Sequence, residues 1–335
     1  MNEKNGLIVR KVIDSYRTIG VMGLAKNTGK TTTLNAIINL YPKKTIGLTS
    51  IGLDGESLDQ VNFLPKPRIY VRPGMVVATA DSCLQNSTVI YEELFKTGYH
   101  TAIGEIILAK ILSEGHLIVA GTTTNRELAL LIDLMKRHTD FILIDGAFNR
   151  MTFANIHNME ALILATGASY HPSMEQTLLQ TQFITEVFAS KKTDFPYQNT
   201  PMTIETTSDF VMFNDKKTIT VMDWFTHHDE PIKRIWIKGA LTAKLMDTFM
   251  MQDVKNITLV LEDPTKCLLK HTYRTYLVQR NIQIEVIKPC EIILVSLNPW
   301  SPSGHHYDAH TFYETMKHTL NIPVIDVCQK RSSYV

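Results

Sequence analysis

The sequence predicts an α/β fold whose first half holds a mostly parallel sheet with added antiparallel hairpins, followed by a second α/β domain. A short β-rich run, residues 18–22, leads through a loop into a segment with apolar residues at helical spacing, which Tyr41-Pro42 ends. A second apolar run, Phe141 to Ile144, has the composition of a buried parallel strand. In the second half, short apolar runs alternate with helical patterns.

The loop between the first strand and helix has the residue order of a P-loop. Residues 22–35 read MGLAKNTGKTTTLN, and a strand before and a helix after are the context that this motif requires. Backbone N–H groups would point at the β- and γ-phosphates, with the Lys30 ammonium beside them and the Thr31 hydroxyl on Mg²⁺. A Gly-Lys turn before an ordinary helix is the alternative. The expected nucleotide-binding residues are Asn27, Thr28, Gly29, Lys30, Thr31 and Thr32.

The loop departs from the usual GxxxxGK[ST] pattern at its first glycine. That position falls on Leu24, and the glycine is displaced to Gly23. The remainder resembles the loop of the metal-dependent P-loop class that includes MobB-type proteins, dethiobiotin synthetase and the ParA/MinD ATPases. In ParA and MinD a second lysine lies five residues before the phosphate lysine, whereas here Ala25 holds that place and Lys26 follows it. The resemblance implies that Lys26 acts in catalysis across a homodimer interface; a solvated loop lysine is the alternative.

Acidic residues follow two predicted strands. Asp145 comes directly after the apolar run 141–144, which is the Walker B form, and it is expected to bind Mg²⁺ together with Thr31. Asp54 lies in an acidic turn after the predicted strand 45–50 and is expected to orient water or contact the metal during catalysis. An ordinary Asp-Gly turn is the other interpretation of Asp54.

ATP is the expected nucleotide, and GTP is less favoured. Guanine-specific P-loop proteins commonly use an NKxD or TKxD element. The nearest string here, residues 191–194 (KKTD), lacks the first residue of that element. The sequence therefore predicts Mg²⁺ and ATP as cofactors.

Composition predicts a folded cytoplasmic protein. The 335 residues are 44% hydrophobic and 20% charged, no apolar run approaches the roughly 18 residues of a membrane span, and the N-terminus lacks a signal-peptide pattern. The formal net charge of +1 gives no electrostatic reason to expect nucleic-acid or membrane partners. The four cysteines are widely spaced, with no CxxC pair, so neither a disulfide framework nor a zinc knuckle is indicated.

The expected division of the chain is a nucleotide-binding domain at 1–190, an irregular linker with a hairpin at 191–231, and a second α/β domain at 232–335. The last segment contains no phosphate loop, metal-ligand spacing or nucleophile-base set, so we expect it to recognise a partner. Within it the turn around Trp300 is the expected exposed anchor, with a packed loop as the alternative.

The loop at 22–35, the segment GLTSIGLDGES at 47–57, KPRIYV at 66–71, LIDGAFNR at 143–150 and the late NPWSPSG together resemble the P-loop subunit of the lysine 5,6-aminomutase reactivase. The resemblance is strongest over residues 17–170. It implies a subunit that uses ATP, together with a MutS-like ATPase partner, to restore a cobalamin-dependent aminomutase whose cofactor is damaged. A small-molecule kinase or ligase of the dethiobiotin synthetase or MobB type is the runner-up, and a scaffold that holds nucleotide without hydrolysis is a third possibility.

Overall fold

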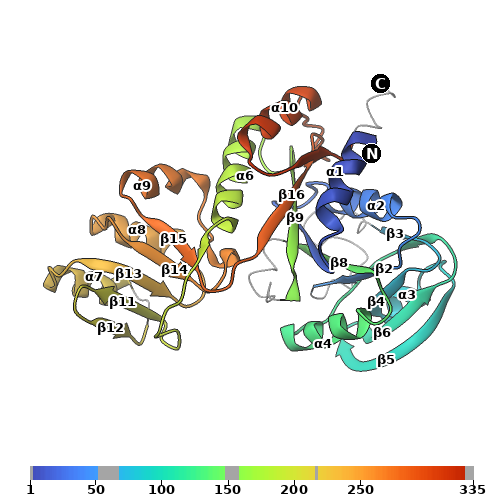
Figure 1. Cartoon of the computed structure of the whole chain (residues 1–335), viewed down its shortest axis with the longest axis horizontal. Coiled ribbons are helices and arrows are strands. Elements are labelled where there is room, and N and C mark those ends of the chain that lie inside the picture. Colours follow the sequence, from blue (N-terminus) through green and yellow to red (C-terminus); the bar gives the residue numbers. More distant parts are fainter. Residues whose placement is uncertain (1–2, 52–67, 148–157, 216–217, 329–335) are drawn as a thin grey trace. The chain divides into compact units, whose positions relative to one another are not determined.

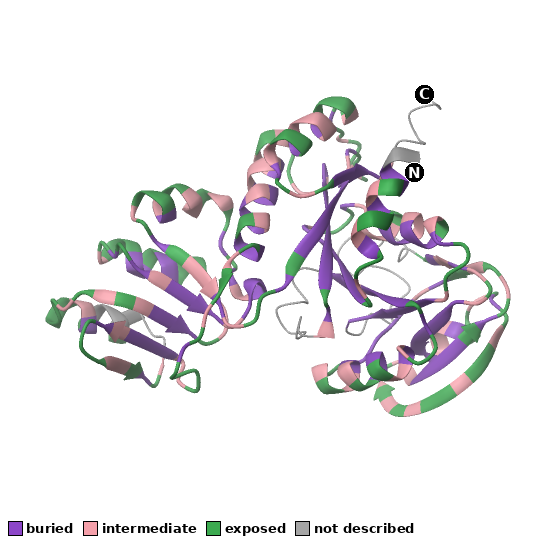
Figure 2. Ribbon diagram, viewed as in Figure 1, coloured by how far each residue is buried: buried purple, intermediate pink, exposed green. Residues whose placement is uncertain are grey.

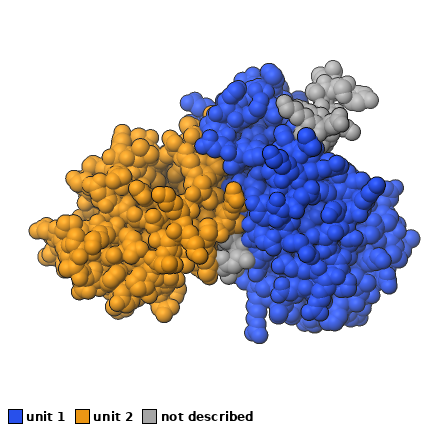
Figure 3. All heavy atoms as spheres, viewed as in Figure 1, with its two compact units in different colours: residues 1–177, 292–335 blue, residues 178–291 orange. Residues whose placement is uncertain are grey.

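The chain forms two compact units in the computed structural model, which describes residues 3–51, 68–147, 158–215 and 218–328. Unit 1 combines residues 1–177 with residues 292–335, and unit 2 is the intervening segment 178–291 (Figure 3). Unit 1 is therefore built from two separate stretches of sequence. Unit 2 is inserted between them.

Unit 1 is organised around one mixed sheet, whose strand order in the described residues is β17-β16-β9-β1-β8-β2-β4-β6-β5 (Figure 1). The pairs β9·β1, β1·β8, β8·β2, β2·β4 and β16·β17 are parallel, whereas β4·β6 and β6·β5 are antiparallel. A separate antiparallel pair joins β3 to β7. The strands of unit 1 are β1 (Thr18–Gly23), β2 (Ile46–Ser50), β3 (Ile69–Val71), β4 (Val76–Ala80), β5 (Tyr91–Thr101), β6 (Gly104–Ile111), β7 (Gly115–Leu117), β8 (Phe141–Ala147), β9 (Ala161–Gly167), β16 (Glu291–Asn298) and β17 (Val324–Asp326).

Helices pack on both faces of this sheet. Leu34 and Ile37 of α2 share one core cluster with Val21 and Leu48. Gly47 faces the other way, because successive strand residues alternate, and a methyl group built on it would lie 3.0 Å from Met135 of α4. The helices are α1 (Glu3–Ile13), α2 (Lys30–Leu40), α3 (Asp81–Gln85), α4 (Asn125–Met135), α10 (Ala309–Thr319) and α6 (Met174–Phe188), which continues into unit 2.

The central strands are buried on both faces, as Figure 2 shows. Every residue of β1, β2 and β9 is buried, which agrees with their continuous apolar sequences. The edge strand β5 differs, since all of its residues are exposed or half-buried. Burial therefore distinguishes these three strands from the edge strand β5.

Unit 2 has its own sheet, with the strand order β10-β15-β14-β13-β11-β12. The first four strands pair in parallel, and β11 pairs antiparallel with both β13 and β12. Phe249 and Leu259 lie in its core, fully shielded from solvent. The elements are β10 (Lys191–Lys192), β11 (Met202–Thr206), β12 (Phe210–Phe213), α7 (Thr218–His227), β13 (Ile232–Ile237), α8 (Ala243–Met251), β14 (Thr258–Leu261), the 3₁₀ turns at Pro264–Lys266 and His271–Tyr273, α9 (Arg274–Gln279) and β15 (Gln283–Val286).

This division differs from the expected one in two ways. The segment 191–231, expected to be an irregular linker with a hairpin, supplies β10, β11, β12 and α7 to unit 2, and β11 and β12 form a hairpin with its turn at 207–209. The last two strands, β16 and β17, were expected in a second domain but belong to the sheet of unit 1. Both strands have the buried apolar pattern of central parallel strands, which does not specify the sheet that they join.

Several local predictions agree with the structure. The alternation of strands and helices expected in the second half is present, with 232–237 forming β13, and Thr124 caps α4 by accepting a hydrogen bond from the Glu127 N–H at 3.2 Å. The antiparallel hairpins predicted for the first half are present, since β6 pairs antiparallel with both β4 and β5. None of the helices in the described residues has the length and apolarity needed to cross a bilayer.

Candidate functional site

The site predicted from the sequence lies at the carboxyl ends of β1 and β8, which are neighbours in the centre of the sheet. The two strands pair in parallel, with Val21 opposite Asp145 and Gly23 opposite Ala147. After β1 the chain passes through residues 24–29, called here the 24–29 loop, and enters α2 at Lys30. The 24–29 loop is attached to the next strand as well, since the Leu24 N–H donates to the Ala165 carbonyl of β9 at 2.8 Å.

Gly29 begins α2 in a conformation that suits glycine. Its φ is +94°, in the left-handed region, and a methyl group built on it would lie 2.8 Å from Cβ of Asn298. Gly29 at the N-cap has no side chain that could cap the helix, and the first turn of α2 contains no acidic residue. The first N–H groups of a helix have no acceptor within the helix, so this end of α2 offers donors and positive potential to an anion.

Lys30 and Asp145 meet at this edge. Their Nζ and Oδ1 atoms are 2.9 Å apart, and their side chains are 25% and 19% exposed. Oδ1 of Asp145 is shielded from solvent and accepts no hydrogen bond of good geometry from the residues that the structure describes. The ion pair with Lys30 is therefore the interaction that compensates this carboxylate. Asp145 lies inside β8, two residues before its end, and not beyond the strand as expected.

The other predicted loop residues occupy distinct environments. Thr28 is buried and its hydroxyl donates to the Ala25 carbonyl at 2.9 Å, which closes the turn of the 24–29 loop. Thr31 is half-buried in the first turn of α2, and Thr32 beside it is exposed. Lys26 is an exposed residue of the 24–29 loop. Asp54, the remaining predicted catalytic residue, lies outside the described residues.

Two residues that sequence reasoning missed hold the 24–29 loop from other strands. The carbonyl oxygen of Asn27 accepts a hydrogen bond from Ser169 Oγ at 3.1 Å and another from Asn298 Nδ2 at 3.2 Å. Asn298 ends β16, and Ser169 follows β9. A polar residue at the end of a buried strand was the available signal, and the same signal identified Asp145. A close approach of two backbones supports this junction, because a methyl group on Gly167 would lie 1.9 Å from the Asn298 carbonyl oxygen.

The turn around Trp300 belongs to unit 1 and follows Asn298 directly. Trp300 is 36% exposed and stacks on His306, with ring centroids 5.0 Å apart. The Trp300 N–H donates to Asn298 Oδ1 at 3.2 Å. The exposed anchor expected for a second domain is therefore an extension of the strand that contacts the 24–29 loop.

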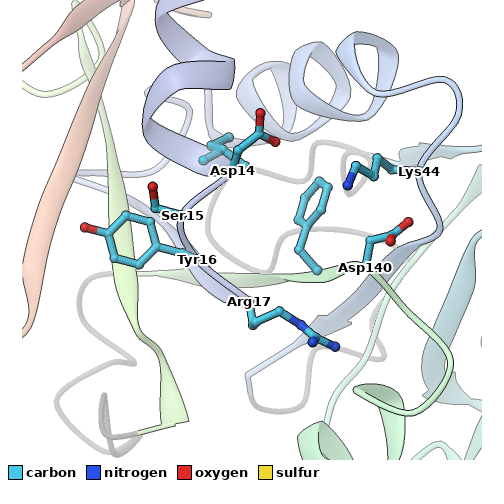
Figure 4. Close-up of a pocket in the computed structure, with 8 residues that line it drawn as sticks. Asp14, Ser15, Tyr16, Arg17, Lys44 and Asp140 are labelled. Atoms are coloured by element: carbon cyan, nitrogen blue, oxygen red, sulfur yellow. The ribbon is translucent and has the colours of Figure 1, made fainter.

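A small pocket of about 90 Å³ lies at the other end of these strands, beside the residues that precede β1 and β8 (Figure 4). Its lining includes Asp14, Arg17 and Asp140, from the segments that precede β1 and β8. The Asp140 carboxylate accepts the Thr45 N–H at 2.7 Å, and the Arg17 guanidinium donates to the carbonyls of Lys136 and Thr139. Because these charges hold the chain itself together, and because the pocket is remote from Lys30, we assign it a structural role.

No protein-family model, curated protein or solved structure matches this chain. The function is therefore argued from the geometry of the site and from the motifs that form it.

Proposed function

We propose that the 24–29 loop and the first turn of α2 bind the phosphates of ATP, and that the chain hydrolyses ATP as a subunit of a reactivase for a cobalamin-dependent aminomutase. One observation carries the first part. Lys30, the first residue of α2, forms an ion pair with Asp145 at the carboxyl ends of the parallel strands β1 and β8, and Gly29 before it has no capping side chain. The second part is supported by the sequence resemblance described above.

The chemistry of the helix start favours a phosphate. Unpaired backbone donors at a helix N-terminus and an adjacent ammonium group are the features that proteins use to bind phosphoryl oxygens. Here Gly29 allows the backbone to turn without a side chain in the way, and Lys30 follows it directly. Hydrogen bonds to charged groups contribute roughly 1.5 to 3 kcal/mol each, so several such contacts would support micromolar affinity.

The residues present fit a Mg²⁺ ion that arrives with the nucleotide. Asp145 offers a shielded carboxylate oxygen that no hydrogen-bond donor among the described residues satisfies, and Thr31 offers a hydroxyl on the first turn of α2. These two side chains would hold the ion. When bound, Mg²⁺ neutralises the charge that develops on the phosphoryl oxygens.

The ion pair also explains why nucleotide and metal should bind together. A phosphate attracts the Lys30 ammonium away from Asp145, and this leaves the largely shielded carboxylate without an ion-pair partner among the residues that the structure describes. A cation at Asp145 compensates that charge. We therefore expect ATP and Mg²⁺ each to strengthen the binding of the other.

The reactivase role gives this switch its partners. By the resemblance, the chain acts with a MutS-like ATPase subunit and promotes the exchange of damaged cobalamin from an aminomutase. Loops that contact the γ-phosphate are ordered before hydrolysis and released after it, so ATP turnover can be converted into movement of a partner.

Calorimetry of the full chain with ATP, in the presence and absence of Mg²⁺, tests the nucleotide site. We expect Lys30→Ala to lower ATP affinity about tenfold or more. Lys44→Ala removes the same charge from an exposed position near the other edge of the sheet and should leave affinity unchanged. Equal affinities of native and Lys30→Ala protein would contradict the proposal.

ATP turnover tests the reactivase role separately. We expect turnover to rise when an inactivated cobalamin-dependent aminomutase and a MutS-like subunit are added, without any phosphorylated metabolite. Phosphate transfer that depends on a metabolite would identify a small-molecule kinase instead. ATP that remains bound and unhydrolysed for hours, even with the partners, would identify a scaffold.

A further inference from the structure

The Asn27 carbonyl oxygen joins two distant segments of the chain. Ser169 donates to it from 142 residues away, and Asn298 donates from 271 residues away. The Asn27 backbone has a φ of +62°, in the left-handed region, which asparagine adopts more readily than most residues. A single carbonyl of the 24–29 loop therefore fixes both segments.

These two segments are the ones through which the chain passes between its units. Ser169 lies between β9 and α6, and α6 crosses the boundary at residues 177–178. Asn298 is the last residue of β16, which crosses the other boundary at residues 291–292. Each of the two segments that connect unit 1 to unit 2 therefore has a residue hydrogen-bonded to the Asn27 carbonyl oxygen.

The path from Ser169 to α6 is firmly held inside unit 1. The Tyr307 hydroxyl donates to the His171 carbonyl, and it lies 3.3 Å from the Ser173 carbonyl and 2.7 Å from the Thr177 hydroxyl. Ala168 N–H donates to the Asn298 carbonyl at 3.0 Å, so the segment is fixed at its start as well. The segment from Ser169 to the first turn of α6 is therefore held by hydrogen bonds near its start and at the beginning of the helix.

The rest of α6 is equally well held inside unit 2. Phe183 and Val187 lie in the core of that unit. The Glu186 carboxylate accepts hydrogen bonds from Nε and Nη2 of Arg274, both at 2.7 Å. Gln180 Oε1 accepts the His271 N–H at 2.8 Å. The part of α6 in unit 2 is therefore fixed both to the core of that unit and to its neighbouring helix α9.

We infer that nucleotide occupancy of the 24–29 loop is transmitted to unit 2 through the Asn27 carbonyl, with Ser169 and Asn298 as positioning residues. This inference rests on the proposed function. The N–H groups that follow Asn27 face the phosphates in the proposed complex, so phosphate binding reorients the peptides next to this carbonyl and changes both of its hydrogen bonds together. The response of unit 2 then reports whether nucleotide is bound.

Hydrogen exchange of the full chain, measured with and without Mg²⁺-ATP, tests the inference. In the native protein we expect Mg²⁺-ATP to change the exchange rates of amides in 178–188 and in the core strands of unit 2 by about threefold or more. Ser169→Ala removes one donor. Asn298→Asp replaces the Nδ2 donor by an oxygen but keeps the acceptor used by Trp300 and Cys328. Both variants should lose the response in unit 2, measured at a Mg²⁺-ATP concentration that calorimetry shows to saturate each of them.

Ser301→Ala is the matched control, because this hydroxyl contacts Ser303 in the adjoining turn, and it should keep the native response. Thermal unfolding of each variant confirms that it is folded. If Mg²⁺-ATP binds by calorimetry but leaves exchange in unit 2 unchanged in the native protein, or if both variants keep the full response, the inference is wrong and the nucleotide site stands. If ATP does not bind the native protein, the proposed function itself is wrong.

Discussion

The Lys30 ammonium lies 2.9 Å from Oδ1 of Asp145, with both side chains mostly shielded from solvent. Each group is thus the other's counter-charge in the ligand-free chain, although the motifs assign one to phosphate and the other to metal. Removal of either partner leaves the other charge uncompensated. This dependence makes the two residues separable by experiment.

Asp145→Asn should abolish the strengthening of ATP binding by Mg²⁺. Without the carboxylate the metal loses a ligand, and Lys30 is free for phosphate, so affinity for metal-free ATP should rise by about fivefold at most, as expected for a partly exposed ion pair. Calorimetry with Mg²⁺ and with a chelator measures both effects. Asp140→Asn removes an equal charge at the start of the same strand, and it should keep the native Mg²⁺ dependence.

Gly29→Ala should destabilise the chain and weaken ATP binding. The left-handed φ costs a side chain about 1 to 2 kcal/mol, and the added methyl group would overlap Cβ of Asn298 at 2.8 Å. The matched variant is Gly74→Ala, since Gly74 has a similar φ of +88° but nothing within 4 Å of the added group. Thermal unfolding should show a larger loss for Gly29→Ala, and only that variant should change ATP affinity. Similar losses in both would show that Asn298 does not constrain Gly29.

Asp54→Asn should preserve ATP binding and remove most of the ATP turnover, because a residue that orients water acts on the chemical step. A single-turnover assay, alongside calorimetry, separates the two. Asp59→Asn, in the same segment, serves as the control. Native turnover by the Asp54→Asn protein would remove Asp54 from the catalytic residues.

The buried cysteines should resist alkylation in the folded protein. Burial raises the pKa of the Cys267 and Cys290 thiols to about 12, so at pH 8 only about one in ten thousand is a reactive thiolate. Cys83 and Cys328 are half-buried. Mass spectrometry after iodoacetamide treatment should find Cys83 and Cys328 modified first, and the other two only after unfolding. Early modification of Cys267 would contradict this assignment.

Local sequence patterns predicted the elements that each form from a continuous stretch. The strand, loop and helix at 18–40 could be identified because the glycine, the lysine and the apolar spacing all lie within one short segment. The position of Asp145 near the carboxyl end of a buried strand could be predicted for the same reason, since four apolar residues precede it directly. Their spatial pairing followed from the rule that parallel strands end at one edge.

Contacts distant in sequence could not be predicted in this way. The Thr33 and Ser296 hydroxyls, buried and 2.7 Å apart, help to place β16 against α2, yet nothing near Ser296 in the sequence refers to residue 33. The segment 191–231 was misjudged because its polar residues and prolines resemble a linker. Its residues 202–206 instead form β11, which is stabilised by backbone hydrogen bonds to β13. The composition of the segment does not indicate these bonds.

Because unit 1 is formed by two separate stretches of sequence, its sheet cannot be completed until unit 2 has been synthesised. The ribosome releases β9 before all of unit 2, and β16 and β17 emerge last among the strands. Until then the β9 edge lacks its neighbour in the sheet, and Asn27 lacks one of its two donors. The nascent chain must therefore carry an open sheet edge while unit 2 is made, a stage at which exposed edges promote aggregation. The 24–29 loop therefore gains the contact with Asn298 only after all of unit 2 has been synthesised.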